Sequence, residues 1–125
     1  FVMKDGEPFM SFGLMGGAMQ PQGHVQVLVN IIDFGMDVQT AGDAARFNHD
    51  GGRQPTGVDE DLLGTLLLEP GVQAETVEQL RAMGHRVEVD GTGAPFGGYQ
   101  AIMRLPSGVY VGATEMRKDG TVAAW

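Results

Sequence analysis

The sequence has 125 residues, no cysteine and a formal net charge of -8 at pH 7. This length fits one domain, and 8 basic residues against 16 acidic ones exclude a nucleic acid as the natural partner. The lack of cysteine excludes disulfides, thiol catalysis and thiolate metal sites, but it leaves the compartment open. No apolar run approaches the roughly 20 residues of a membrane span.

The first expected element is a β-hairpin. Residues 1–3 and 8–12 are apolar runs that flank an Asp5-Gly6 turn, which is the usual pattern of two paired strands. A chain that opens inside a hairpin, without an initiator methionine, is expected to be a fragment of a longer protein.

Residues 13–23 read as a glycine-rich loop, and the clearest helix follows. Apolar side chains recur in residues 25–34 at i, i+3, i+4 and i+7, and a second apolar row leaves a narrow polar stripe. A helix this apolar needs cover on most of its circumference, so we expect a sheet and further helices against it. Gly35 is expected to end it.

Asp37 is the expected N-cap of a short second helix, after which residues 47–55 read as loop. The apolar run at residues 62–68 fits either a buried strand or a short helix. Periodicity does not decide between the two.

The C-terminal half contains a third helix spaced by Ala74, Val77 and Leu80 and ended by Gly84, and then a strand over residues 86–89. Residues 99–105 and 109–114 are expected to pair as a second hairpin. Hairpins mixed with helices predict an α+β fold, with a mostly antiparallel sheet and helices packed on it.

Two loops superficially match ligand-binding motifs. Residues 91–98 are glycine-rich, but Pro95 and the strand that follows contradict a phosphate loop, which must open a helix. Residues 59–61 suggest a calcium loop, but Leu63 stands where an oxygen ligand is needed and Pro70 where the closing glutamate belongs. We expect neither ligand.

Histidines and serines give no catalytic or metal constellation. His24, His49 and His85 lie far apart without metal-ligand spacing, so no metal site is expected and a packed or solvated side chain is favoured for each. Alternatively, His24 could cap a helix and His49 could orient a carboxylate. Ser11 and Ser107 lack the context of a nucleophile elbow.

Gly16 and Gly17 remain as the candidate site, immediately before the apolar helix. Consecutive N–H groups without side chains can converge on one oxyanion, helped by the positive end of a helix. A plain tight turn explains the same spacing, so both alternatives stay open on the residues alone.

Five stretches, in this order, carry a family resemblance: GLMGGAMQPQGHVQVLVN, FGMDVQTAGDAARFNHDGG, LRAMGHRVEVD, FGGYQAIMRL and VGATEMRKDGTVAAW. Together they resemble the C-terminal part of the small subunit of the γ-glutamyltranspeptidase family of N-terminal-nucleophile hydrolases. The likeness spans nearly the whole chain, so residues 1–125 are expected to be one incomplete domain within an αββα sandwich.

The resemblance implies a self-cleaving precursor whose small subunit begins with a nucleophilic threonine that lies upstream of Phe1. That threonine would take the γ-glutamyl group of glutathione or a similar amide and pass it to water or an acceptor. Gly16 and Gly17 match the glycine pair that stabilises the oxyanion and lines the substrate site. The implied partners are the rest of the small subunit and the large subunit; no cofactor is implied, and the fragment alone is expected to be inactive.

The chain departs from the family pattern at several positions. Leu14 and Met15 stand where serine and proline often precede the glycine pair, and residues 44–49 and 115–117 differ from the usual Ala-Pro-Arg-His-His and Asp-Pro-Arg. Related members are acylases of glutaryl- or cephalosporin-type amides, so an acylase and a non-catalytic homologue used for assembly remain alternatives. We interpret Arg46 and Arg117 as structural, tying loops to carboxylates or carbonyls.

Overall fold

The computed structural model describes residues 1–51 and 64–125. The chain divides into two compact units: Phe1–Ala44 together with Gly97–Trp125, and Ala45–Phe96. Each unit has its own sheet and its own hydrophobic cluster. That all 125 residues belong to one domain of a longer protein stays a prediction.

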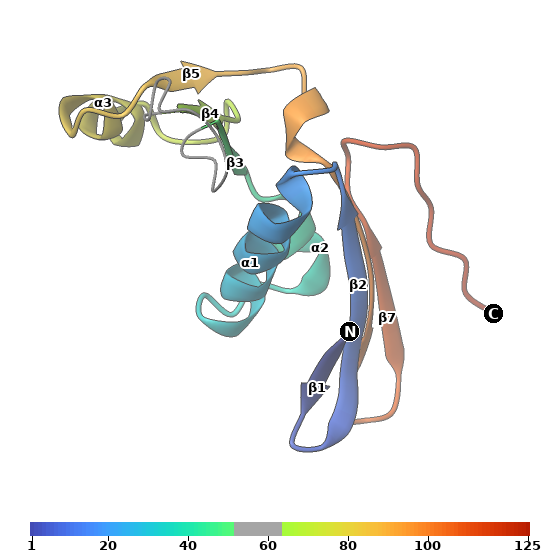
Figure 1. Ribbon diagram of the computed structural model, residues 1–125. Helices are drawn as coiled ribbons and strands as arrows, with labels where there is room; N and C mark the ends of the chain where they lie inside the picture. Colours follow the sequence, from blue (N-terminus) through green and yellow to red (C-terminus); the bar gives the residue numbers. More distant parts are fainter. Residues whose placement is uncertain (52–63) are drawn as a thin grey trace, which may run out of the picture. The chain divides into compact units, whose positions relative to one another are not determined.

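The first unit is built on an antiparallel sheet of four strands in the order β1-β2-β6-β7 (Figure 1). The strands are β1 (Val2–Lys4), β2 (Glu7–Met15), β6 (Gly98–Arg104) and β7 (Tyr110–Thr114). Both predicted hairpins are confirmed, since β1 pairs with β2 and β6 with β7. The central pair, β2 with β6, joins segments far apart in the sequence.

The first hairpin turn has the conformation that its residues favour. Asp5 has φ 53° and Gly6 has φ 82°, and positive φ at both central residues is the geometry of a type I′ turn. This turn matches the right-handed twist of the flanking strands, which explains why a two-residue connection suffices.

Two helices pack on one face of this sheet, α1 (Met19–Ile32) and α2 (Val38–Asp43). Alternate residues of β2, such as Met10 and Leu14, enter the core between sheet and helices. The C-terminal segment after β7 runs along the other side of the sheet (Figure 1). Among the described residues, no helix has both the length and the hydropathy needed to cross a bilayer.

Helix α1 begins at Met19, so the prediction of a loop through residue 23 was wrong. Pro21 lies in the first turn of the helix, where its missing N–H leaves no intrahelical hydrogen bond unmade. Gly23 lies inside the helix, at a position where a Cβ would come within 2.6 Å of the Leu14 side chain. Close packing of α1 on β2, rather than turn formation, requires this glycine.

The other end of α1 is as expected. The helix ends at Ile32, Gly35 has φ 68°, and the Met36 N–H donates to the Asn30 carbonyl across the turn. The expected cover around the helix, however, is incomplete within the described chain, where Val25 is 62% exposed. Only the side that faces the sheet is buried.

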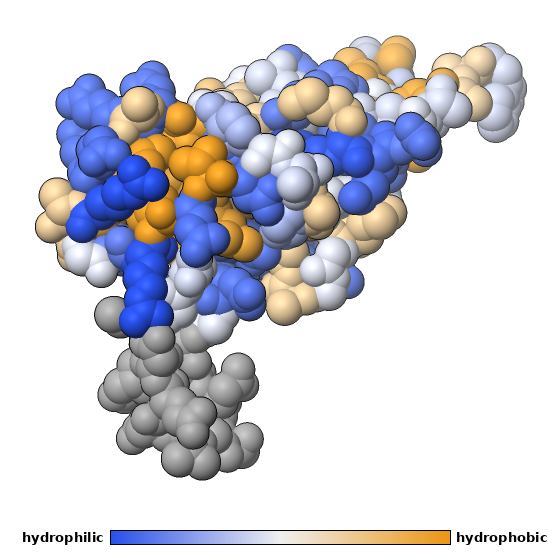
Figure 2. Space-filling view, turned by 90° about the horizontal axis from the view of Figure 1, so that it is seen from above, coloured by the Kyte–Doolittle hydropathy of each residue, from blue (hydrophilic) through white to orange (hydrophobic). Residues whose placement is uncertain are grey.

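The second unit holds a three-stranded sheet in the order β3-β4-β5. Its elements are β3 (Phe47–Asp50), β4 (Thr65–Leu68), α3 (Ala74–Ala82) and β5 (Val87–Val89). The predicted third helix and the strand after it are confirmed. Figure 2 shows hydrophobic side chains gathered on the surface of this unit, where an apolar pocket is lined by residues that include Leu66, Leu68 and Leu80.

Two loop and strand assignments are settled by pairing in this sheet. Residues 47–50 form a strand because they pair antiparallel with β4, so the prediction of a loop over residues 47–55 was wrong there. The apolar run ends as strand β4 rather than as a helix. Its pairing with β5 is parallel, since α3 forms the crossover between the two strands. The rejected calcium loop at residues 59–61 lies outside the described residues.

Candidate functional site

Gly16 and Gly17 form the exposed turn between the end of β2 and the start of α1. Their φ angles are 131° and 58°, a region that side chains strongly disfavour. The turn is closed through their carbonyl oxygens, because Met19 and Gln20 donate their N–H groups to Gly16 and Gly17 at 3.0 and 3.1 Å.

The N–H groups of Gly16 and Gly17 make no hydrogen bond to any residue that the structure describes. The turn therefore carries two exposed donors that are available to a ligand.

The start of α1 adds no group that competes for an anion. Its N-cap is Ala18, no side chain caps the first turn, and no acidic residue lies there. The aligned peptide dipoles place partial positive charge at this end. A negative charge on the exposed side of the glycine turn would thus be stabilised by both features.

The backbone of Gly97 packs against Gly16 in the turn, a role that the sequence did not reveal. An added Cβ on Gly16 would lie 3.1 Å from Gly97 Cα and 3.2 Å from Met19 Cβ. Gly97 has φ 75°, and a Cβ there would overlap the Met15 carbonyl oxygen. Glycine is needed at both Gly16 and Gly97 for these backbones to approach so closely. Of the two, only Gly16 was recognised from the sequence as a candidate site residue.

His24 lies on α1 and interacts with β2. Its Nε2 accepts a hydrogen bond of 3.1 Å from the Leu14 N–H, and its ring meets Phe12 edge-on with centroids 5.1 Å apart. It is therefore a packed side chain and does not cap a helix. Within residues 1–51 and 64–125, no three His, Cys, Asp or Glu side chains gather in a metal-binding cluster.

Arg46 and Arg117 bind backbone carbonyls, as interpreted from the sequence. Arg46, 2% exposed, donates from Nη1 to the Phe96 carbonyl at 2.8 Å. Arg117 donates to the carbonyls of Gly42 and Ala44 and to Glu115. Each guanidinium holds chain segments in place within its own unit.

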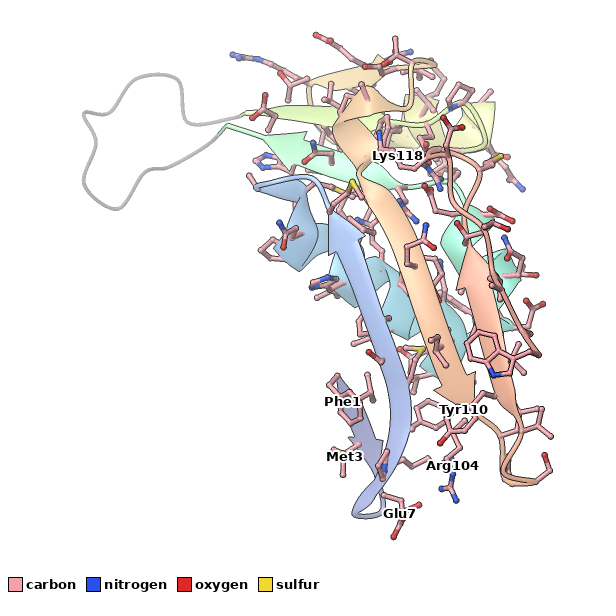
Figure 3. The ribbon with its side chains drawn as sticks, turned by 90° about the vertical axis from the view of Figure 1, so that its right-hand side faces the viewer. Phe1, Met3, Glu7, Arg104, Tyr110 and Lys118 are labelled. Carbon is pink, nitrogen blue, oxygen red and sulfur yellow. The ribbon has the colours of Figure 1, made fainter. Side chains whose placement is uncertain are left out.

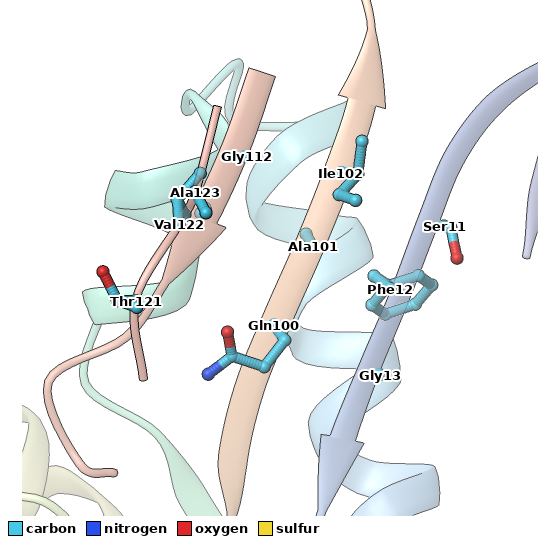
Figure 4. Close-up of a pocket in the computed structure, with 11 residues that line it drawn as sticks. Ser11, Phe12, Gly13, Gln100, Ala101, Ile102, Gly112, Thr121, Val122 and Ala123 are labelled. Atoms are coloured by element: carbon cyan, nitrogen blue, oxygen red, sulfur yellow. The ribbon is translucent and has the colours of Figure 1, made fainter. Parts of the chain in front are cut away.

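A pocket of about 380 Å³ lies on the sheet face opposite the helices (Figure 4). It lies between the strands and the C-terminal segment, where Val122 packs over Gly112. None of its lining residues is titratable, and neither Gly16 nor Gly17 is among them. This pocket is therefore unsuited to acid-base chemistry and is separate from the glycine turn.

Charged side chains lie at both ends of this sheet (Figure 3). Lys118 packs its aliphatic stem against Gly98, the partner of Met15 at the end of β2. At the opposite end, Arg104 Nη1 lies 3.9 Å from Glu7 Oε2, and both side chains are exposed. Lys118 is therefore a cation at the end of the sheet where β2 meets the glycine turn.

Comparison with known proteins gives a consistent assignment. The family model for γ-glutamyltranspeptidase matches residues 1–125. The chain is 32% identical over 123 residues to the glutathione hydrolase proenzyme of Escherichia coli (strain K12). The matched region makes up 98% of this chain and 19% of that protein. It is also 32% identical to the acylase ACY 1 proenzyme of Pseudomonas sp. (strain SE83), with 98% and 20% covered.

Solved structures agree. A cephalosporin acylase from Bacillus halodurans has a TM-score of 0.82 and 40% identity, over 98% of this chain and 21% of that one. A γ-glutamyltranspeptidase from Pseudomonas nitroreducens, complexed with L-DON, has a TM-score of 0.76 and 25% identity, over 99% and 59%. The α+β fold is confirmed, and the chain spans about a fifth of the length of its curated relatives. The chain belongs to the γ-glutamyltranspeptidase family.

Proposed function

We propose that this chain is the C-terminal part of the small subunit of an amide-cleaving acyltransferase or hydrolase that acts on glutathione or other γ-glutamyl amides. The names of the relatives support this proposal, since they include a glutathione hydrolase proenzyme and acylase proenzymes. The nucleophilic threonine, the rest of the small subunit and the large subunit would come from the same precursor. The 125 residues by themselves are expected to be inactive, because the threonine implied by the family is not among them.

In this proposal the Gly16 and Gly17 N–H groups stabilise the oxyanion of acyl transfer. When a threonine hydroxyl attacks the amide carbonyl, the π electrons of that carbonyl move onto its oxygen, which becomes negative. Two donors aimed at that oxygen stabilise the charge more than they stabilise the neutral substrate. The observation that carries the proposal is the exposed positive-φ turn, whose two amides have no partner among the described residues.

A second candidate for the substrate is an amide with a different acyl group. The 40% identity to a cephalosporin acylase favours an acylase of the same general mechanism but with a different side-chain specificity. A non-catalytic homologue used for assembly is the remaining alternative. The residue at the cleavage junction of the full-length precursor distinguishes a non-catalytic homologue from an enzyme, because catalysis requires a threonine there.

A matched pair of glycine variants in the full-length precursor tests the oxyanion role. Gly17 and Gly35 flank the two ends of α1, have φ of 58° and 68°, and an added Cβ would have no neighbour within 4 Å at either position. Gly→Ala therefore introduces the same backbone strain, about 1 kcal/mol, at both. Only position 17 would carry the oxyanion donor.

We expect Gly17→Ala to lower kcat for acyl-enzyme formation at least about tenfold, because the strain of the added methyl group displaces the turn and misaligns the N–H that alanine retains. Gly35→Ala should remain within about twofold of the wild type, and both variants should mature by self-cleavage. Burst kinetics with γ-glutamyl and glutaryl anilides would measure the effect and reveal the acyl preference. Equal activity of the two variants would contradict the oxyanion role.

A further inference from the structure

We infer that His24 is a positioning residue that holds the Gly16-Gly17 turn in its active geometry. The inference rests on the proposed function, since it assigns His24 a role in the same site. It starts from the backbone of β2 at Leu14, two residues before Gly16.

The Leu14 N–H donates to the Nε2 atom of His24 at 3.1 Å. A side chain of α1 thus supplies the acceptor for the strand amide that lies two positions before Gly16. The Phe12 ring, edge-on to the imidazole at 5.1 Å, keeps the ring oriented.

A second contact joins the same elements at the same place. The Leu14 side chain packs against Gly23, the neighbour of His24, so closely that a Cβ on Gly23 would lie 2.6 Å from Leu14 Cδ1. Leu14 is therefore held by its backbone through His24 and by its side chain through Gly23. Both ends of the intervening segment, which contains the glycine pair, are fixed.

These two contacts of Leu14 matter because glycine has the greatest backbone freedom of any residue. Two adjacent glycines with positive φ keep their N–H groups aimed at one point only if the segments on both sides are fixed. Preorganised donors stabilise a developing charge without reorganisation, and a misplacement of about 1 Å is enough to lower a rate by up to about 10²-fold.

The hydrogen bond defines the chemistry that the position needs. An imidazole nitrogen that accepts must be unprotonated, so His24 carries its proton on Nδ1 in this state. Glutamine offers an acceptor at a similar reach, whereas leucine fills similar space without one. His24→Gln and His24→Leu therefore separate the hydrogen bond from simple packing.

The test uses the full-length matured enzyme. We expect His24→Leu to lower kcat about tenfold or more with KM changed less than about threefold, and His24→Gln to recover to within about threefold of the wild type. His85→Leu, an exposed histidine in the other unit, is the control and should stay within twofold. Equal impairment of the Gln and Leu variants, or an unchanged Leu variant, would overturn the inference.

Amide hydrogen exchange at Leu14 gives a readout that does not depend on turnover. Exchange should be at least about tenfold faster in His24→Leu than in the wild type and slow again in His24→Gln; unchanged exchange overturns the inference. A failed oxyanion role would appear differently, as a fully active Gly17→Ala enzyme. If the Leu variant does not fold, nitrogen-15 shifts of His24 in the wild type decide: an unprotonated Nε2 supports the inference, and a protonated one overturns it.

Discussion

The guanidinium of Arg117 donates to the carboxylate of Glu115 at 2.6 Å, with both side chains almost fully buried at 4% and 0% exposure. The same guanidinium reaches the carbonyls of Gly42 and Ala44 at 2.9 and 3.0 Å. One planar group thus fixes the end of α2 to the segment after β7. A lysine, which has a single ammonium group, cannot reproduce this set of bonds.

Arg117→Met should destabilise the full-length protein by about 3 kcal/mol or more, because it removes the guanidinium that pairs with the buried Glu115 carboxylate. Denaturant unfolding would measure the loss. Arg104→Met is the matched control, since the Arg104–Glu7 pair is exposed and 3.9 Å long and such pairs contribute below about 1 kcal/mol. Similar losses in the two variants would contradict the structural role of Arg117.

Gly97→Ala should destabilise the first unit by about 3 kcal/mol, because it combines overpacking against the Met15 carbonyl with a φ of 75°. Gly108→Ala provides the comparison: its φ is 87° and its added Cβ has no neighbour within 4 Å. The control should lose only about 1 kcal/mol, from backbone strain. Unfolding of the two variants side by side measures the difference, and an equal loss would show that Gly97 is not sterically confined.

Asp37 should make stability depend on pH in the acid range. Hydrogen bonds from the Thr40 side chain and then the Thr40 amide hold the pKa of the Asp37 carboxyl below its ordinary value. A folded-state pKa below that of the unfolded chain gives a stabilisation that is present above about pH 4 and is lost as the pH falls through the folded-state pKa.

Comparing the wild type with the Asp37→Ala and Asp37→Asn variants isolates the pH-dependent contribution of Asp37 to stability. Asp37→Ala should be less stable than the wild type at pH 6, and the difference should shrink toward pH 3. Asp37→Asn keeps an N-cap acceptor that does not titrate, so its advantage over the Ala variant should remain constant with pH. Thermal unfolding from pH 3 to 6 measures both differences, and a constant gap between wild type and Asp37→Ala would refute the linkage.

Local signals predicted several turns and helix ends in both units. Asp5-Gly6 specified a hairpin turn, Asp37 specified an N-cap that accepts from the Gln39 and Thr40 amides, and Gly35 and Gly84 marked helix ends. Each of these residues acts through its own backbone or its immediate neighbours. Their effect is therefore readable without knowledge of the fold.

The features that the sequence did not reveal depend on distant partners. Gly23 looked like a loop residue, yet it lies in α1, where the packing of Leu14 leaves no room for a Cβ. Residues 47–50 lacked a strand pattern and became a strand by pairing with β4. Gly97 stood in a glycine-rich stretch for which no function was predicted from the sequence, whereas in the structure it packs against the turn at Gly16, which lies far away in the sequence.

The packing of Gly16 on Gly97 has a consequence for how this segment can evolve. A side chain at position 16 would meet the Gly97 backbone, and Gly97 itself has no room for one. Homologues that keep this loop geometry should therefore carry glycine at both positions. Because the proposed oxyanion donors belong to the main chain, the side chains around them would be free to diversify, which fits relatives named both as glutathione hydrolases and as acylases.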